Sequence, residues 1–142
     1  MDKHEILATI NANPSFFLAT LENGEPRVRG MLLYRADHEG ILFHTGNMKD
    51  VYRQLLANPT VELCFLDHQK MLQVRVRGTA RLIEDLQLKK EIVNSPGREF
   101  LKPLVENLGL DILAVFRVER CQALVWTMET NFAQKELIRI SG

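Results

Sequence analysis

The sequence predicts a single mainly β domain, a closed or nearly closed antiparallel β-barrel with a few flanking helices. Six or seven segments show the alternation, or the short apolar run, that is typical of strands. Short turns separate most of these segments, which favours antiparallel pairing over parallel crossovers. The 142 residues are enough for one hydrophobic core, and they contain no linker or low-complexity tract, so we expect one domain over residues 1–142.

The expected elements follow in order, beginning with three strands that form an antiparallel meander. We expect a short helix at 2–13, which ends before Pro14, and then strands at 15–22, 26–35 and 41–45. Asn23-Gly24 separates the first two strands and is a strong hairpin pattern. Gly46-Asn47 ends the third strand and offers a cap to the helix that follows.

The second half of the chain is expected to complete the barrel and to add helices. We expect helices at 48–58 and 85–94, a further helix ending at Leu108, and strands at 60–66, 71–83, 112–128 (broken near Glu119-Arg120) and 136–140. Along residues 71–83 the even-numbered positions from Leu72 to Leu82 form the core face, and Arg75 and Arg77 lie on the opposite face.

Composition and charge exclude some classes of partner. The chain has 18 basic and 18 acidic residues, so no overall field attracts nucleic acid or an anionic membrane, and any anion site must be local. No apolar run reaches membrane-spanning length and the first residues lack a signal-peptide core, so we expect a cytoplasmic protein. Cys64 and Cys121 lie in apolar strand segments and are expected to be buried thiols, although a single disulfide stays an alternative.

Most catalytic templates are missing from the sequence. It contains no Gly-x-Ser-x-Gly elbow and neither of the common glycine-rich phosphate loops. The four histidines show no metal-ligand spacing, so we expect no metal site. No catalytic residue is identified by these patterns.

A local anion site is the chemistry that remains. Arg29 lies on the second strand, Thr45 ends the third strand directly before a helix, and Lys49 lies in the first turn of that helix. A hydroxyl, free helix-terminal N–H groups and a cation together suit a phosphate. The alternative is that Arg29 and Lys49 are ordinary solvated charges. The alternation also puts Arg29, Met31 and Leu33 on one face, which we assign to the exterior, where an apolar cover such as a second subunit is needed.

Five segments, in order and spacing, resemble the pyridoxamine 5′-phosphate oxidase-like, FMN-binding split-barrel family. They are residues 29–33, 40–45, 49–59, 61–65 and 73–78. The resemblance implies a six-stranded antiparallel split β-barrel with flanking helices. It also implies a homodimer that holds one FMN in each of two interfacial clefts.

The resemblance implies a cofactor site, residue by residue. Its members would be Arg29, Gly30, Met31, Leu32, His44, Thr45, Lys49, Gln73 and Trp126. Arg29 and Lys49 would hold the FMN phosphate, and the backbone of residues 30–32 would face the ring. His44, Thr45 and Gln73 would contact the flavin, and Trp126 would cover it from the partner subunit. For Trp126 the alternative is a packed core or interface residue. Arg75 and Arg77 match no motif, and we favour their pairing with acidic residues across the sheet over a contribution to the field at the flavin.

Two departures bear on the reaction. Met48 stands where relatives often carry an arginine, and Tyr34 stands where true pyridoxamine phosphate oxidases carry a substrate-binding lysine. We therefore expect a small FMN-dependent oxidoreductase, unlike a true pyridoxamine phosphate oxidase, that passes hydride through flavin N5 between a small-molecule donor and acceptor. The alternatives are a non-catalytic flavin-binding, storage or sensor protein, a haem or deazaflavin binder in which His44 is the candidate haem ligand, or a homodimer without a cofactor.

Overall fold

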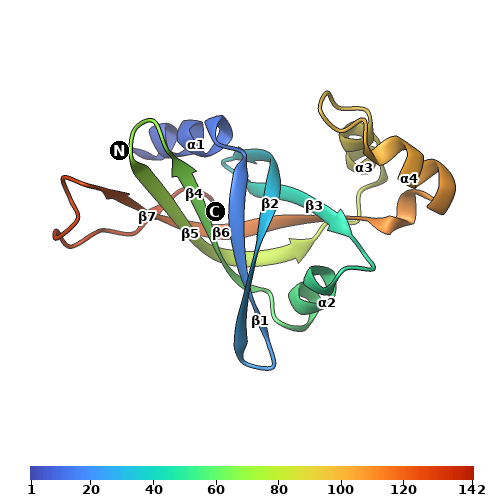
Figure 1. The fold of residues 1–142 in the computed structure, drawn as a ribbon, viewed down its shortest axis with the longest axis horizontal. Helices are drawn as coiled ribbons and strands as arrows, with labels where there is room; N and C mark the ends of the chain where they lie inside the picture. The colour runs from blue at the N-terminus through green and yellow to red at the C-terminus, as the bar shows by residue number, and fades with distance from the viewer.

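Seven strands and four α-helices make up the fold of the computed structural model, which describes all 142 residues (Figure 1). In chain order they are α1 (Lys3–Ala12), β1 (Ser15–Glu22), β2 (Glu25–Asp37), β3 (Gly40–Gly46), α2 (Asp50–Ala57), β4 (Thr60–Asp67), β5 (Leu72–Leu82), α3 (Leu86–Val93), α4 (Leu101–Leu108), the 3-10 turn η1 (Leu110–Ile112), β6 (Leu113–Thr127) and β7 (Ile138–Arg139). The strand order is β3-β2-β1-β4-β5-β6-β7, and β3 also pairs with β6. Strands β1 to β6 therefore close into an antiparallel barrel, which confirms the predicted fold class.

The hairpin and the meander are confirmed. Asn23 and Gly24 have φ angles of 53° and 79°, as a two-residue turn between twisted strands requires. Glu22 then pairs with Glu25, and this register places every later residue of β2 opposite its partner in β1. Strands β1, β2 and β3 lie side by side in that order (Figure 1).

The expected break near Glu119-Arg120 is wrong, because β6 runs without interruption over 15 residues. A bulge takes up the irregularity: Arg120 adopts a φ of 53°, and the β5–β6 register shifts between Arg77 and Thr79. Gly78 lies at this shift, where an added Cβ would approach the Val118 side chain to 2.5 Å. The residues near Glu119-Arg120 therefore form a bulge within one continuous strand and do not separate two strands.

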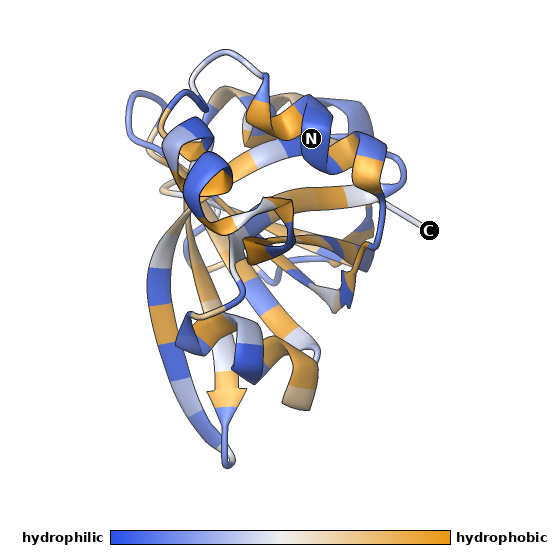
Figure 2. Cartoon of the chain, turned by 90° about the vertical axis from the view of Figure 1, so that its right-hand side faces the viewer, coloured by the Kyte–Doolittle hydropathy of each residue, from blue (hydrophilic) through white to orange (hydrophobic).

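Two apolar clusters stabilise the fold. The larger fills the barrel around four fully buried phenylalanines, in which Phe16 stacks on Phe65 with ring centroids 4.9 Å apart and Phe43 stacks on Phe116 at 5.8 Å. The smaller lies under α3 and α4 and includes Leu88 and Ile92. Figure 2 shows the corresponding alternation of apolar and polar residues along the strands.

The assignment of Arg29, Met31 and Leu33 to the exterior is wrong. Leu33 is only 4% exposed and belongs to the core, and Met31 packs against the same cluster. Cross-strand partners share a face, and Arg29 lies opposite the fully buried Leu18. Before the register shift between Leu33 and Arg35, the outward residues of β2 are therefore the even-numbered ones, including Val28, which is 70% exposed.

Two further expectations concern the start of α2 and the thiols. The N-cap of α2 is Lys49 and no side chain caps it, so the predicted Gly46-Asn47 cap is wrong; the Asn47 amide instead donates to the Asp111 carbonyl oxygen at 3.1 Å. Cys64 and Cys121 are free, with Cys121 buried and Cys64 half-buried. None of the helices combines the length and the apolar character needed to span a bilayer.

Candidate functional site

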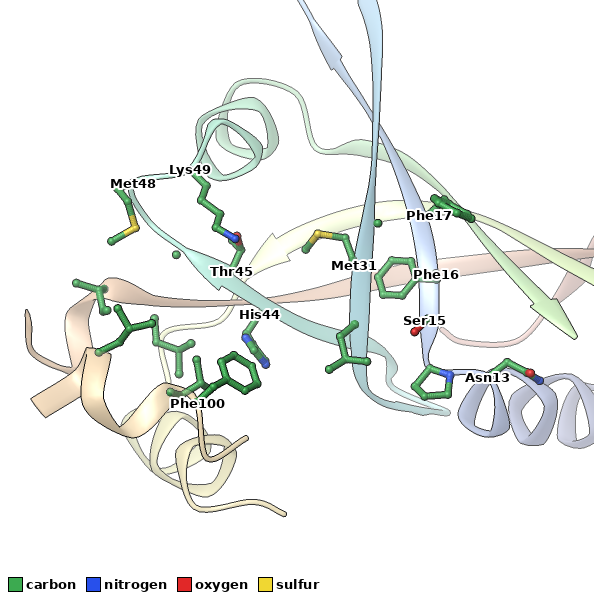
Figure 3. A pocket seen from close by; sticks show the side chains of 18 of the residues that line it. Asn13, Ser15, Phe16, Phe17, Met31, His44, Thr45, Met48, Lys49 and Phe100 are labelled. Carbon is green, nitrogen blue, oxygen red and sulfur yellow. The ribbon is translucent and has the colours of Figure 1, made fainter. Parts of the chain in front are cut away.

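The barrel is split between β2 and β3. These strands pair only where Leu33–Asp37 of β2 meets Gly40–Phe43 of β3. Beyond Phe43, His44 to Gly46 pair with β6 alone, and the part of β2 before Leu33 pairs with β1 alone. A cavity of about 980 Å³ adjoins both diverging strands (Figure 3).

Six of the nine predicted cofactor residues line this cavity. They are Gly30, Met31, Leu32, His44, Thr45 and Lys49. Figure 3 shows His44, Thr45 and Lys49 approaching from β3 and the start of α2, and Met31 from β2. The resemblance therefore selected residues that the fold brings to one place, although they come from separate segments of the chain.

The walls of the cavity are largely apolar. Phe16 and Phe17 of β1 contribute to one wall, and Leu101 and Leu104 of α4 contribute to another, with Phe100 just before that helix. Binding sites for small molecules combine such apolar walls with a few polar groups, and a volume of this size accepts a drug-sized ligand. The site therefore suits a largely apolar ligand with a few polar groups.

Backbone donors of β2 face the split. The Leu33 N–H donates to the Pro14 carbonyl oxygen, on the side where β1 lies. Because amide directions alternate along a strand, the N–H groups of Leu32 and Gly30 point the other way, toward the open side. No strand pairs with that edge of β2 at these residues. A bound ligand can therefore accept hydrogen bonds from β2.

One end of the cavity carries a buried hydroxyl and a lysine. The hydroxyl of Thr45 is buried, with the residue 6% exposed, and its Oγ1 has no hydrogen-bond partner. A buried hydroxyl without a partner costs about 1–3 kcal/mol, so such a group in a cavity wall suits a hydrogen bond to a bound molecule. Lys49 is exposed at the uncapped N-terminus of α2 and forms no ion pair. The nearby Asp50 carboxylate pairs with Arg53 at 3.3 Å.

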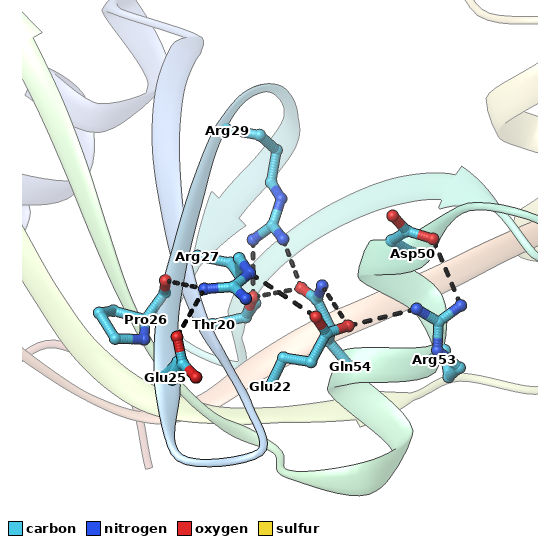
Figure 4. A network of polar contacts seen from close by, with 9 residues as sticks. All are labelled: Thr20, Glu22, Glu25, Pro26, Arg27, Arg29, Asp50, Arg53 and Gln54. Atoms are coloured by element: carbon cyan, nitrogen blue, oxygen red, sulfur yellow. Dashed lines mark hydrogen bonds and ion pairs between the residues drawn. The ribbon is translucent and has the colours of Figure 1, made fainter.

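Arg29 does not line the cavity. Its guanidinium donates to Thr20 Oγ1 at 2.8 Å and to Gln54 Oε1 (Figure 4). It also donates to the Leu18 carbonyl oxygen at 3.2 Å. Burial lowers the pKa of Arg29, and the carboxylates of Asp50 and Glu22 oppose that shift. The arginine thus joins β1 and β2 to α2, the helix whose N-terminus adjoins the cavity. Its contact with a phosphate stays a prediction.

The His44 side chain is held by a residue that the sequence did not single out. Arg98, in the connection between α3 and α4, donates from Nε to His44 Nε2 at 3.0 Å and from Nη2 to the Leu33 carbonyl oxygen at 2.8 Å. Burial lowers the pKa of His44 to about 4, with further lowering by the charges of Arg98 and Lys49. An iron ligand at Nε2 would have to displace the Arg98 bond, which weakens the case for haem.

Gln73 and Trp126 lie apart from the cavity. They are opposite each other in the β5–β6 register, on the outer face of the barrel. The Trp126 indole N–H donates to Asn131 Oδ1 at 2.9 Å. On the same face Arg77 pairs with Glu62 at 3.6 Å, as expected, whereas Arg75 forms no ion pair. Nowhere in the fold do three or more His, Cys, Asp or Glu side chains gather where they could hold a metal ion.

Sequence comparisons with known proteins agree on one family. The family described as "Pyridoxamine 5'-phosphate oxidase" matches residues 2–121. A pyridoxine/pyridoxamine 5'-phosphate oxidase from Hyphomonas neptunium is 44% identical over 70 residues, which are 48% of this chain and 32% of that protein. A second such oxidase, from Actinobacillus succinogenes, is 30% identical over 95 residues, or 66% of this chain and 45% of the relative. The chain thus spans less than half the length of these relatives.

A solved structure resembles the whole fold. A protein from Clostridium acetobutylicum, described as related to general stress protein 26 and as a member of the pyridoxinephosphate oxidase family, superimposes with a TM-score of 0.71. The match covers 99% of this chain and 97% of the other at 19% sequence identity. This level of identity supports the shared fold.

Proposed function

The chain belongs to the pyridoxamine 5′-phosphate oxidase family, and from that premise we propose that it binds FMN in the cavity between β2 and β3. We further propose that the bound flavin serves the oxidation or reduction of a small molecule. The supporting observations are the charge and polarity at one end of the cavity, the apolar walls, and the free backbone donors.

One observation carries the proposal. The buried hydroxyl of Thr45 has no hydrogen-bond partner, and Thr45 lies shortly before the N-terminus of α2. Thr45 and Lys49 line the same cavity, four residues apart, and between them the chain turns from β3 into the helix. A phosphate here would accept a hydrogen bond from the Thr45 hydroxyl and lie near the Lys49 ammonium and the positive end of the α2 dipole. FMN ends in such a phosphate, whereas riboflavin does not.

The polarity of the rest of the cavity matches that of the isoalloxazine ring. Its apolar walls suit the faces of the ring, and the N–H groups of Gly30 and Leu32 suit its carbonyl and ring-nitrogen acceptors. When bound, FMN would supply reversible hydride and electron transfer. The protein would then hold the phosphate, orient the ring and limit access of water, and a separate acid or base is not required.

We propose that two copies of the chain complete the site. Phe17, Val28 and Leu32 form an exposed apolar surface on β1 and β2, which we call the outer-sheet patch. Phe17 and Leu32 also line the cavity, so the patch and the cavity are continuous. A second copy that covers the patch could bring its own Gln73 and Trp126 toward the flavin. This supports a homodimer with the cofactor at the interface.

Pyridoxal phosphate synthesis is not part of the proposal. Tyr34 stands where a substrate-binding lysine is expected in the true oxidases, and its hydroxyl is engaged with Glu91 at 2.6 Å and with Ser95 at 2.9 Å. A phosphate of a second molecule would meet the Glu91 carboxylate in this place, which disfavours binding.

The visible spectrum of the purified protein tests the proposal. We expect flavin absorption bands that persist after desalting, or that appear when FMN is added to the colourless protein and excess is removed. Reduction of the bound flavin by a reduced nicotinamide without oxygen would distinguish an enzyme from a flavin-storage protein. A Soret band would indicate haem instead, and a protein that rejects added FMN would refute the assignment.

A further inference from the structure

Arg98 occupies the vertex of the split in the barrel. It is 9% exposed, although it lies in the connection between two helices rather than in the barrel itself. One of its nitrogens bonds to the Leu33 carbonyl oxygen on β2, and another bonds to the His44 ring on β3. Leu33 forms the last pair between the two strands, with Phe43, and His44 is the first residue of β3 beyond that pair. Arg98 therefore bridges the strands where they diverge.

The same bond determines where the His44 proton lies. A guanidinium only donates hydrogen bonds, so the nitrogen that receives its Nε–H must carry a lone pair. This nitrogen is Nε2, which leaves the proton of the neutral ring on Nδ1. Nδ1 makes no hydrogen bond with any other part of the protein, and the ring lines the cavity. A free histidine side chain in water favours the opposite form, with the proton on Nε2.

We propose that Arg98 is a positioning residue that fixes His44 as the Nδ1–H tautomer, so that the cavity presents a hydrogen-bond donor to a carbonyl oxygen or unprotonated ring nitrogen of its ligand. The inference has two halves. The ligand half, that the Nδ1–H group donates to a bound molecule, rests on the proposed function, in which the acceptor belongs to the flavin ring. The tautomer half concerns the protein alone.

The surroundings of the residue agree with a fixed role. The Arg98 guanidinium lies over the Tyr34 ring at 5.5 Å, and the Tyr34 hydroxyl is in turn held by Glu91 and Ser95 of the α3 region. The low pKa of His44 keeps the ring neutral at physiological pH, as the tautomer requires. Arg98 thus has a further contact besides His44 and Leu33, which limits the positions that its Nε–H can take.

Nitrogen-15 NMR of the histidine rings tests the tautomer in the protein without added ligand. The long-range couplings distinguish a ring protonated on Nδ1 from one protonated on Nε2, and comparison with His44→Gln assigns the His44 signals. We expect the Nδ1–H form in the wild-type protein at neutral pH. The Nε2–H form there would overturn the inference, whether or not any variant folds.

Arg98→Met tests the cause of the tautomer. We expect His44 in this variant to shift to a mixture dominated by the Nε2–H form. Arg35→Met is the matched control, because Arg35 also lies over the Tyr34 ring, at 5.6 Å, but does not contact His44. A pure Nδ1–H form in Arg98→Met, or an equal shift in both variants, would show that Arg98 does not position the ring.

Ligand affinity tests the donor. His44→Leu removes the Nδ1–H group, and we expect it to weaken FMN and riboflavin binding alike, by roughly fivefold to tenfold, since one hydrogen bond to the ring is lost. Unchanged affinity for both would overturn the ligand half. A wild-type protein that binds neither flavin overturns the proposed function together with the ligand half, while the NMR result still decides the role of Arg98.

Discussion

The low pKa of His44 predicts a specific loss of stability in mild acid. Burial and the charges of Arg98 and Lys49 lower that pKa to about 4, against about 6.5 for histidine in an unfolded chain. Between these two values the unfolded chain binds a proton at this residue and the folded protein does not. Proton binding therefore favours unfolding, and the free energy of unfolding falls as the pH drops from 6.5 toward 4.

The size of the effect follows from the two pKa values. Integrating the difference in proton binding from pH 8 down to pH 5 gives about 2 kcal/mol of lost stability from His44 alone, most of it below pH 6.5. Nearly complete loss, about 3 kcal/mol, is reached near pH 4. Either figure is a sizeable fraction of the stability of a domain of this size.

Urea unfolding at pH 5, 6, 7 and 8, followed by circular dichroism, measures the effect in the wild-type protein and in His44→Gln. The variant lacks the titrating group, so its stability should fall between pH 8 and pH 5 by about 2 kcal/mol less than that of the wild type. Taking the difference removes the contribution of all other groups, including the carboxylates. Both proteins are compared at one concentration, because association would alter apparent stability. Parallel pH profiles would refute the reasoning.

Three further predictions concern the anion site and the outer-sheet patch. Lys49→Ala should weaken FMN binding by about tenfold or more and leave riboflavin binding nearly unchanged in titration calorimetry, because a charge-assisted phosphate contact is lost; equal losses would place Lys49 elsewhere. Thr45→Val should raise the stability of the ligand-free protein by about 1 kcal/mol in thermal unfolding and still weaken FMN binding, since the buried hydroxyl has no partner until a phosphate arrives. Val28→Asp should convert a dimer to a monomer in sedimentation analysis, whereas Leu86→Asp, at a similarly exposed apolar residue on α3, should not; two monomeric variants or two dimeric ones would contradict the assigned interface.

The strands and the hairpin were predictable because their patterns are local. Asn23-Gly24 defines its turn by backbone preference, and the alternation along residues 71–83 correctly separates the buried Val74 and Val76 from the outward Arg75 and Arg77. The family resemblance then supplied what periodicity could not, namely that residues 30–32 adjoin the same cavity as His44, Thr45 and Lys49.

The prediction of the outer face of β2 was wrong because a charged side chain on that strand has buried partners. Arg29 suggested an exterior face for Met31 and Leu33, yet its guanidinium is accommodated by the buried Thr20 and Gln54, which lie on different elements. A single strand gives no information about such partners. Counting strand pairs from the Asn23-Gly24 hairpin would have given the right face. This count places Arg29 opposite Leu18, and paired residues lie on the same face of the sheet.

Arg98 could not be found from the sequence. It follows Ser95-Pro96-Gly97, in a connection with no periodicity and no recognisable motif, and surface exposure is the ordinary expectation for such a residue. Its two partners lie 54 and 65 residues earlier in the chain. Only the packing of α3 and α4 beside the split brings them within hydrogen-bond distance.

The unpaired edge of β2 has a consequence for amide hydrogen exchange. At residues 62–65 of β4, neighbouring strands pair with the backbone on both sides. The amides of Gly30 and Leu32, by contrast, face the split without a partner strand. Their exchange with deuterated solvent should be fast in the free protein and slow once a ligand accepts their hydrogen bonds. The exchange rates of these two amides would thus report whether the cavity is occupied, even by a ligand that does not absorb visible light.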